Sequence, residues 1–128
     1  MSEAERIVRN SGLDWPEHLD AMIAAPEHHA LLLENDVVRV LDSLLKPGES
    51  TPVHTHRWPS AQYVIGLSDF VRRDGEGNVL VDTRENGSLP AAGTAFWSQP
   101  LEPHAVTNVG ASDIRVISVE LKGALSKN

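Results

Sequence analysis

The chain has 128 residues, a length typical of one domain with a single core. Hydrophobic residues make up 41% and charged residues 23% of it, values that exclude the disordered and fibrous classes. A formal net charge of −7, with eleven scattered Lys and Arg residues, argues against nucleic acid as a partner. Because the chain has no cysteine, a metal would have to bind His, carboxylate or amide groups.

The first residues, Met1 to Arg6, are mixed in charge, and no long apolar stretch follows them. We therefore expect neither a signal peptide nor a membrane span, and we expect a cytoplasmic location. The chain is expected to divide into an N-terminal helical segment over 1–29, a barrel over 30–122 and a C-terminal tail over 123–128.

A short helix is predicted near the N-terminus. Asp14 can cap it, and Leu19, Met22 and Ile23 recur at helical spacing until Pro26 ends the pattern. The apolar stripe of this helix either covers an open end of the barrel or packs on a second subunit.

From residue 30 onward, short runs of Val, Leu and Ile alternate with turn signals such as Lys46-Pro47-Gly48 and Asn86-Gly87. With no second helical block, this pattern predicts an all-β sandwich or barrel. The expected strands lie near 30–34, 37–45, 52–56, 61–67, 69–73, 79–84, 93–97, 103–109 and 113–121.

Two of these runs, 37–41 and 114–119, are apolar on both faces for part of their length. Such strands are covered on both sides, so something packs over the outside of the barrel. A second protomer is the simplest candidate, and we therefore expect a homodimer. Burial beneath the N-terminal helix would explain one of the two strands equally well.

The first candidate site is the pair His54 and His56. Side chains alternate along a strand, so the two imidazoles project to one side about 6.6 Å apart and can share a metal ion. Exposed pairs of this kind also occur without a metal. A third histidine, His104, opens a later strand, where Asn108 shares its face by parity or simply begins a turn.

These residues carry a family resemblance. Gly48-x5-His54-x-His56, followed by Tyr63-Val64-Ile65 and then by Pro103-His104-x3-Asn108, resembles the two motifs of the cupin superfamily in the right order. The similarity covers about residues 30–122 and is greatest to small single-domain bacterial cupins. It implies a double-stranded β-helix, or jelly-roll barrel, with a metal deep inside and often a dimer.

One position departs from the family pattern. Cupins of this sort usually have a glutamate a few residues after the second histidine, where this chain has Ser60. Gln62 lies on the same strand face and is a candidate neutral ligand, a partner for bound water, or a polar pocket residue without metal contact.

The missing carboxylate has a chemical consequence. Three neutral imidazoles leave the charge of a divalent ion uncompensated, so the open positions favour an anionic, preferably bidentate ligand. Imidazole ligands suit Fe, Zn, Ni or Cu better than harder ions. A decayed metal site is the alternative.

The aromatic residues near these motifs, Trp58, Tyr63 and Trp97, are candidates for the substrate pocket together with Asn108, although buried aromatics are often simply core. The adjacent His28 and His29 point to opposite faces of an extended chain, so we interpret them as turn or rim residues rather than a chelating pair.

The sequence thus favours a metal-binding cupin with a small-molecule ligand or substrate. The first hypothesis is a metal-dependent, dioxygenase-like enzyme acting on a small anionic chelating substrate. The second is a non-catalytic binding or sensing module, which the lack of an evident general base supports.

Overall fold

The computed structural model describes residues 14–87 and 89–122, so the tail predicted over 123–128 and the first thirteen residues lie outside it. The nine predicted strands are all present. They are β1 (His29–Glu34), β2 (Val38–Leu45), β3 (His54–His56), β4 (Ser60–Gly66), β5 (Phe70–Asp74), β6 (Val79–Asp82), β7 (Ala95–Ser98), β8 (Leu101–Asn108) and β9 (Ile114–Leu121).

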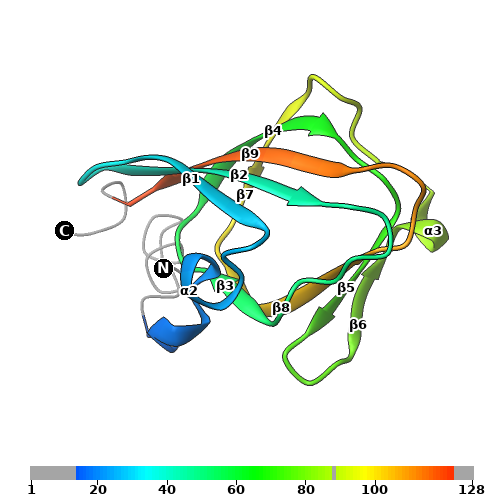
Figure 1. Ribbon diagram of the computed structural model, residues 1–128, viewed down its shortest axis with the longest axis horizontal. Helices are drawn as coiled ribbons and strands as arrows, with labels where there is room; N and C mark the ends of the chain where they lie inside the picture. Colours follow the sequence, from blue (N-terminus) through cyan, green and yellow to red (C-terminus); the bar gives the residue numbers. More distant parts are fainter. Residues whose placement is uncertain (1–13, 88, 123–128) are drawn as a thin grey trace, which may run out of the picture.

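The strands form two antiparallel sheets that face each other across the molecule (Figure 1). One sheet has the order β1-β2-β9-β4-β7 and the other has the order β3-β8-β5-β6. The predicted all-β barrel is confirmed. Within the described ranges, no helix is long enough and apolar enough to span a bilayer.

The N-terminal helix is shorter than predicted and begins later. A 3-10 turn, η1 (Glu17–Leu19), precedes α2 (Ala21–Ala24), and the cap is Asp20 rather than Asp14. The Asp20 carboxylate accepts a hydrogen bond from the Met22 amide at 3.1 Å, which restarts the helix there. Ala21 and Ala25 are buried whereas Ile23 is 55% exposed, so small residues make the contact that the apolar stripe was expected to make.

A second helical turn was not predicted. The strand expected over 79–84 ends at Asp82, and α3 (Thr83–Asn86) follows it. The Asp82 side chain caps this turn through the Arg84 amide, and Gly87 ends it with a φ of 75°. A left-handed residue after a helix is usually glycine, because glycine alone adopts it without steric cost.

Strand register assigns the two faces of the larger sheet. One row of opposed residues points into the barrel, and the next row points out; the outer row is Leu33, Val40, Val119, Ala61 and Trp97. Both ends of this apolar row are open to solvent, since Leu33 is 53% exposed and Trp97 is 50% exposed. The runs 37–41 and 114–119, which are apolar on both faces in the sequence, therefore contribute to an apolar outer face of the sheet.

Strand β1 contains a bulge. His29 is opposite Ser43 and Leu31 is opposite Leu41, but Leu33 is opposite Val40, so the register shifts at Leu32. A bulge adds one residue to a strand and changes which side chains face which side. Here it allows His29 to face inward while Leu33 joins the outer row.

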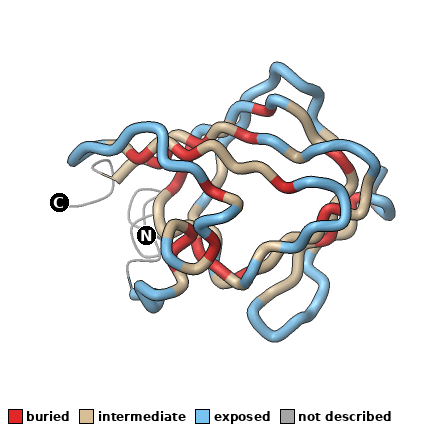
Figure 2. The backbone as a smooth tube through the Cα atoms, viewed as in Figure 1, coloured by how far each residue is buried: buried red, intermediate tan, exposed pale blue. Residues whose placement is uncertain are grey.

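Buried positions cluster around α2 and β3 and recur at intervals along the strands (Figure 2). Many of them are polar. His29, His54, His104, Arg39, Asp20 and Glu120 are all 5% exposed or less. Because such groups are costly to bury unpaired, their gathering in one place marks the part of the molecule where a function is to be sought.

Candidate metal centre

The three histidines predicted as ligands lie together in the barrel. His54 and His104 are directly opposed where β3 pairs with β8, and their ring centres are 4.4 Å apart. The His56 ring centre is 5.1 Å from that of His54 and 5.8 Å from that of His104. Pairing of β3 with β8 thus brings the two sequence motifs to one place.

A fourth histidine, which the sequence analysis placed in a turn or at the rim, belongs to the same cluster. His29 is 5% exposed, and its ring centre lies 4.9 Å from that of His54 and 5.1 Å from that of His56. One ring nitrogen from each of these three residues lies within 4.8 Å of the other two. The interpretation of His29 as a turn or rim residue is therefore wrong; His28 also lines the cavity, but its Nδ1 lies 3.3 Å from the carbonyl of Leu44.

These spacings suit a shared ion. Two imidazoles bound to one metal through bonds of about 2.0 to 2.1 Å at roughly 90° to 110° have ring centres about 4.5 to 5.2 Å apart. Five of the six pairs among these four rings have centres 4.4 to 5.8 Å apart. The side chains are thus close to the arrangement that a metal needs.

Each ring is held by its Nδ1 atom, which lies at hydrogen-bond distance from an oxygen. The oxygens are the carbonyls of Ala25 for His29 (2.9 Å), Pro52 for His54 (2.8 Å) and Glu102 for His104 (2.7 Å), and the Glu120 carboxylate for His56 (2.9 Å). A carbonyl only accepts, so Nδ1 carries the proton and donates it. The lone pair of each ring is then on Nε2, the arrangement found in metal-binding histidines.

The histidines are neutral at ordinary pH. Burial, reinforced by the neighbouring rings, lowers the pKa of His29 and of His56 to about 3 and that of His104 to about 2. Burial also lowers the pKa of His54. Neutral imidazole is the form that binds metal, so no proton has to leave before an ion enters.

A buried charge network supports the cluster from behind. The Arg39 guanidinium donates to both oxygens of Asp20, at 2.8 and 3.0 Å, and to Glu120 at 2.6 Å, while the other oxygen of Glu120 accepts from His56. Burial raises the pKa of the Glu120 carboxyl, and the positive charge of Arg39 opposes that rise. The network links the cap of α2 to the ring of His56, and the sequence analysis did not predict it.

The histidines open onto a cavity of about 300 Å³. Gln62 lines it, as strand parity predicted, and the Gln62 amide nitrogen donates to the Ser60 hydroxyl at 3.1 Å. Among the described residues that line the cavity there is no carboxylate, and Arg72 is the one arginine or lysine. The apolar part of the wall includes Leu44, Leu45, Leu67, Phe70, Phe96, Leu101, Val106, Ile114 and Val116.

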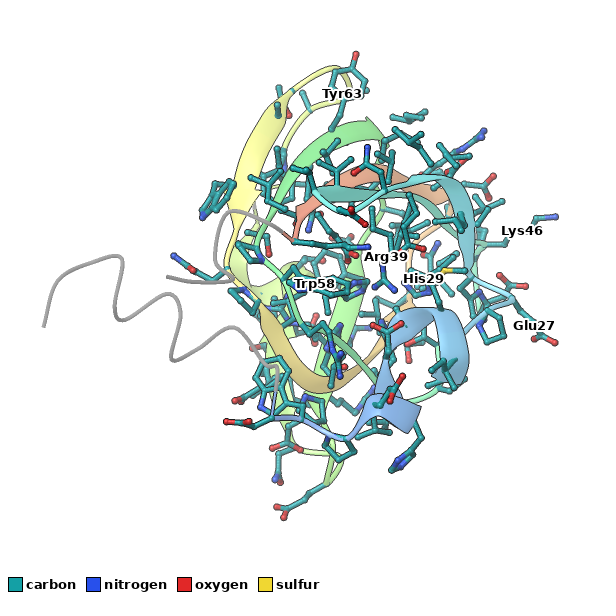
Figure 3. The ribbon with its side chains drawn as sticks, turned by 90° about the vertical axis from the view of Figure 1, so that its left-hand side faces the viewer. Glu27, His29, Arg39, Lys46, Trp58 and Tyr63 are labelled. Atoms are coloured by element: carbon teal, nitrogen blue, oxygen red, sulfur yellow. The ribbon has the colours of Figure 1, made fainter. Side chains whose placement is uncertain are left out.

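Three aromatic side chains predicted to line the pocket lie elsewhere. Tyr63 and Trp97 are each 50% exposed, because their strands turn the neighbours Gln62 and Phe96 inward instead. Trp58 lies beside Arg39, with the guanidinium carbon 4.9 Å from the ring centre, and so packs on the charge network (Figure 3). In the same view His29 and Arg39 lie inside the molecule, and Tyr63 points away from it.

Asn108, the fourth predicted pocket residue, is buried but serves the turn after β8. Its amide nitrogen donates to the carbonyls of Leu45 at 2.9 Å and Ser112 at 2.8 Å. Its oxygen accepts from the Gly110 amide at 3.0 Å. All of these contacts are structural, so the turn interpretation that the sequence left open is the one that agrees with the structure.

Solved structures with a similar fold were found. A cupin domain from Bordetella pertussis is 18% identical with a TM-score of 0.60, covering 74% of this chain and 92% of its own. A conserved protein with a double-stranded β-helix domain from Klebsiella pneumoniae is 22% identical with a TM-score of 0.51, covering 74% of this chain and 76% of its own. An RmlC-like cupin family protein from Methanocaldococcus jannaschii is 11% identical with a TM-score of 0.52, covering 75% of this chain and 80% of its own.

No protein-family model matches the sequence, and no curated protein matches it. The likeness therefore rests on the three-dimensional arrangement of the strands, and at these identities it extends to the fold alone. In that respect the prediction made from the histidine motifs is confirmed: the chain has the double-stranded β-helix fold of the cupins.

Proposed function

We propose that the protein binds one divalent metal ion through His54, His56 and His104 and uses it to hold a small anionic ligand in the barrel. The observation that carries the proposal is the common orientation of the rings: each is fixed through Nδ1, which leaves Nε2 to the ion. Neutral imidazoles favour Fe²⁺, Ni²⁺, Cu²⁺ or Zn²⁺ over Mg²⁺ or Mn²⁺.

The charge of the cavity supports an anionic ligand. The nearest carboxylate to the rings, Glu120, is already bonded to both Arg39 and His56, so it faces away from a ligand. Arg72 adds a cation to the cavity wall, and its charge is one of the causes that lower the pKa of His104. A bound ion would act as a Lewis acid toward a chelating acid.

We expect untagged protein to contain close to one equivalent of metal by plasma mass spectrometry, and the His54→Ala and His104→Ala variants to lose it. With Co²⁺ in the site, malonate should change the visible spectrum, because a dicarboxylate can take the open positions. Arg72→Met should weaken malonate binding at least about tenfold. A hydrogen bond to a charged group contributes at least about 1.4 kcal/mol, which corresponds to a tenfold change in affinity.

Arg73→Met is the matched control, since Arg73 neighbours Arg72 on the same strand but does not line the cavity. It should bind malonate as the unmodified protein does. A folded protein that takes up none of the four metals would overturn the proposal. Equal malonate affinity of the Arg72→Met and Arg73→Met variants would show that Arg72 does not bind the ligand, without contradicting the metal site.

We also propose that a second copy of the chain covers the outer apolar row from Leu33 to Trp97. One patch can pair with its own copy about a two-fold axis, and an open apolar row across five strands is unusual for a monomer.

Sedimentation should give twice the mass of the chain, and Trp97→Glu should give a monomer. Val79→Glu, at a 58% exposed position on the other sheet, should stay dimeric; a monomeric unmodified protein would contradict the proposal.

A further inference from the structure

His29 differs from the other histidines of the cluster in where it comes from. It is the first residue of β1 and follows α2 by only four residues, outside the two motifs that supply His54, His56 and His104. It is nevertheless as buried as they are, and its ring lies about equally far from those of His54 and His56, at 4.9 and 5.1 Å. Its position therefore needs an explanation apart from the cupin motifs.

The chemistry of the cluster without an ion supplies one. All four Nδ1 atoms are committed to oxygens, so four Nε2 lone pairs remain. In the part of the chain that the structure describes, no hydrogen bond reaches any of these Nε2 atoms. All four residues line the cavity, so these lone pairs are accessible from it, and a cation that enters can bind several of them at once.

The three-nitrogen group singles out His29 in particular. The ring nitrogens of His29, His54 and His56 all lie within 4.8 Å of one another, which makes His29 as well placed for a shared ion as either residue of the His-x-His pair. We propose that His29 is a metal ligand beside the three motif histidines, so that the ion joins the N-terminal segment to the barrel. This inference rests on the metal site proposed above.

The connection continues from His29 into the helix. Its Nδ1 donates to the carbonyl of Ala25, at the C-terminal end of α2, and Asp20 at the other end bridges to Thr55 between the two histidines of β3. An ion bound to His29 therefore fixes α2 from one side while the Arg39 network fixes it from the other. Metal uptake should make the segment from Ala21 to His29 more rigid.

The test compares two adjacent histidines. His29→Ala should weaken Zn²⁺ binding, measured against a competing chelator, by more than about 100-fold, because loss of a supporting contact around a metal already costs about 10 to 100-fold. It should also change the visible spectrum of the Co²⁺ form. His28→Ala should change neither: His28 also lines the cavity, but its Nδ1 lies 3.3 Å from the carbonyl of Leu44 and its ring is in none of the close ring pairs of the cluster.

Two measurements do not depend on how well the alanine variant folds. His29→Gln keeps a polar side chain of similar reach, and it should show the same loss of affinity. In the unmodified protein labelled with ¹⁵N-histidine, Zn²⁺ should shift four Nε2 resonances rather than three. Hydrogen exchange at the Ala24 and Ala25 amides, which bond to the carbonyls of Asp20 and Ala21, should slow on Zn²⁺ addition.

The outcomes separate this inference from the proposed function. If the unmodified protein binds no metal, the metal site itself is wrong. If it binds Zn²⁺ tightly, if the two His29 variants bind it equally well and if only three Nε2 resonances shift, then His29 is a structural residue and the inference is overturned while the site remains.

Discussion

Metal-free protein should lose about 5 kcal/mol of its stability between pH 6.5 and pH 5. Burial lowers the pKa of His29 and His56 to about 3 and that of His104 to about 2, whereas the same residues titrate near 6.5 when unfolded. Below pH 6.5 the unfolded chain takes up protons that the folded chain refuses. Each histidine therefore lowers the free energy of unfolding by about 1.4 kcal/mol per pH unit, and three histidines lower it by about 4 kcal/mol per pH unit.

The loss is large compared with the 5 to 15 kcal/mol by which domains of this size are usually stable. The stability that depends on the histidines is complete about one pH unit above 6.5 and falls until the folded pKa values are reached. Urea unfolding in the presence of a chelator, at half-unit steps from pH 7.5 to 5, measures the slope. Aspartates with a lowered pKa, such as Asp20, change the stability only below about pH 4, so they do not contribute to the slope between pH 7.5 and 5.

His104→Leu provides the control, because leucine fills a similar volume and cannot take up a proton. Its stability should depend less steeply on pH, by about 1.4 kcal/mol per unit, even if it is less stable at pH 7. A metal-free protein whose free energy of unfolding is flat from pH 7 to 5 would show that the histidines are not buried in the neutral form.

Arg39→Met should destabilise the fold by about 3 to 5 kcal/mol. The change removes the guanidinium that donates to both Asp20 and Glu120, and it leaves two carboxylates at 5% and 1% exposure without that cation. Methionine keeps much of the aliphatic volume, so loss of packing contributes little. Denaturant unfolding at pH 7 gives the free energy directly.

Arg115→Met is the matched comparison, because Arg115 also donates twice to one aspartate, Asp42, but is 48% exposed. An exposed pair is worth about 0 to 1 kcal/mol, so this variant should be nearly as stable as the unmodified protein. The combination Asp20→Asn, Arg39→Met and Glu120→Gln should be more stable than Arg39→Met alone. Similar losses for the two arginine variants would contradict the buried network.

Strand periodicity accounts for what the sequence could predict. Turn signals delimited all nine strands, and alternation along them correctly turned Gln62 into the barrel. The same alternation excludes Tyr63, which follows Gln62 directly, so aromatic character was a poor guide to the pocket. A residue type suggests chemistry, but its strand parity decides which side of the sheet it occupies.

The residues that escaped prediction are brought in by contacts between distant parts of the chain. Glu120 reaches His56 from 64 residues away and Arg39 reaches Glu120 from 81, and no local pattern reports such pairs. Arg39 also lies in a run that the sequence analysis described only as apolar on both faces. His29 needed the pairing of β1 with β2, because its face is fixed by the opposed Ser43.

The bulge in β1 limits how the length of this chain can vary. Before Leu32 the register of β1 turns His29 to the interior, and after Leu32 it turns Leu33 to the outer face. Deleting Leu32, a residue 56% exposed, would restore an even alternation. Either His29 would then leave the cluster or Leu33 would leave the outer row. A deletion at an exposed position would thus change one face of the protein or the other, while substitutions at the same position would be tolerated.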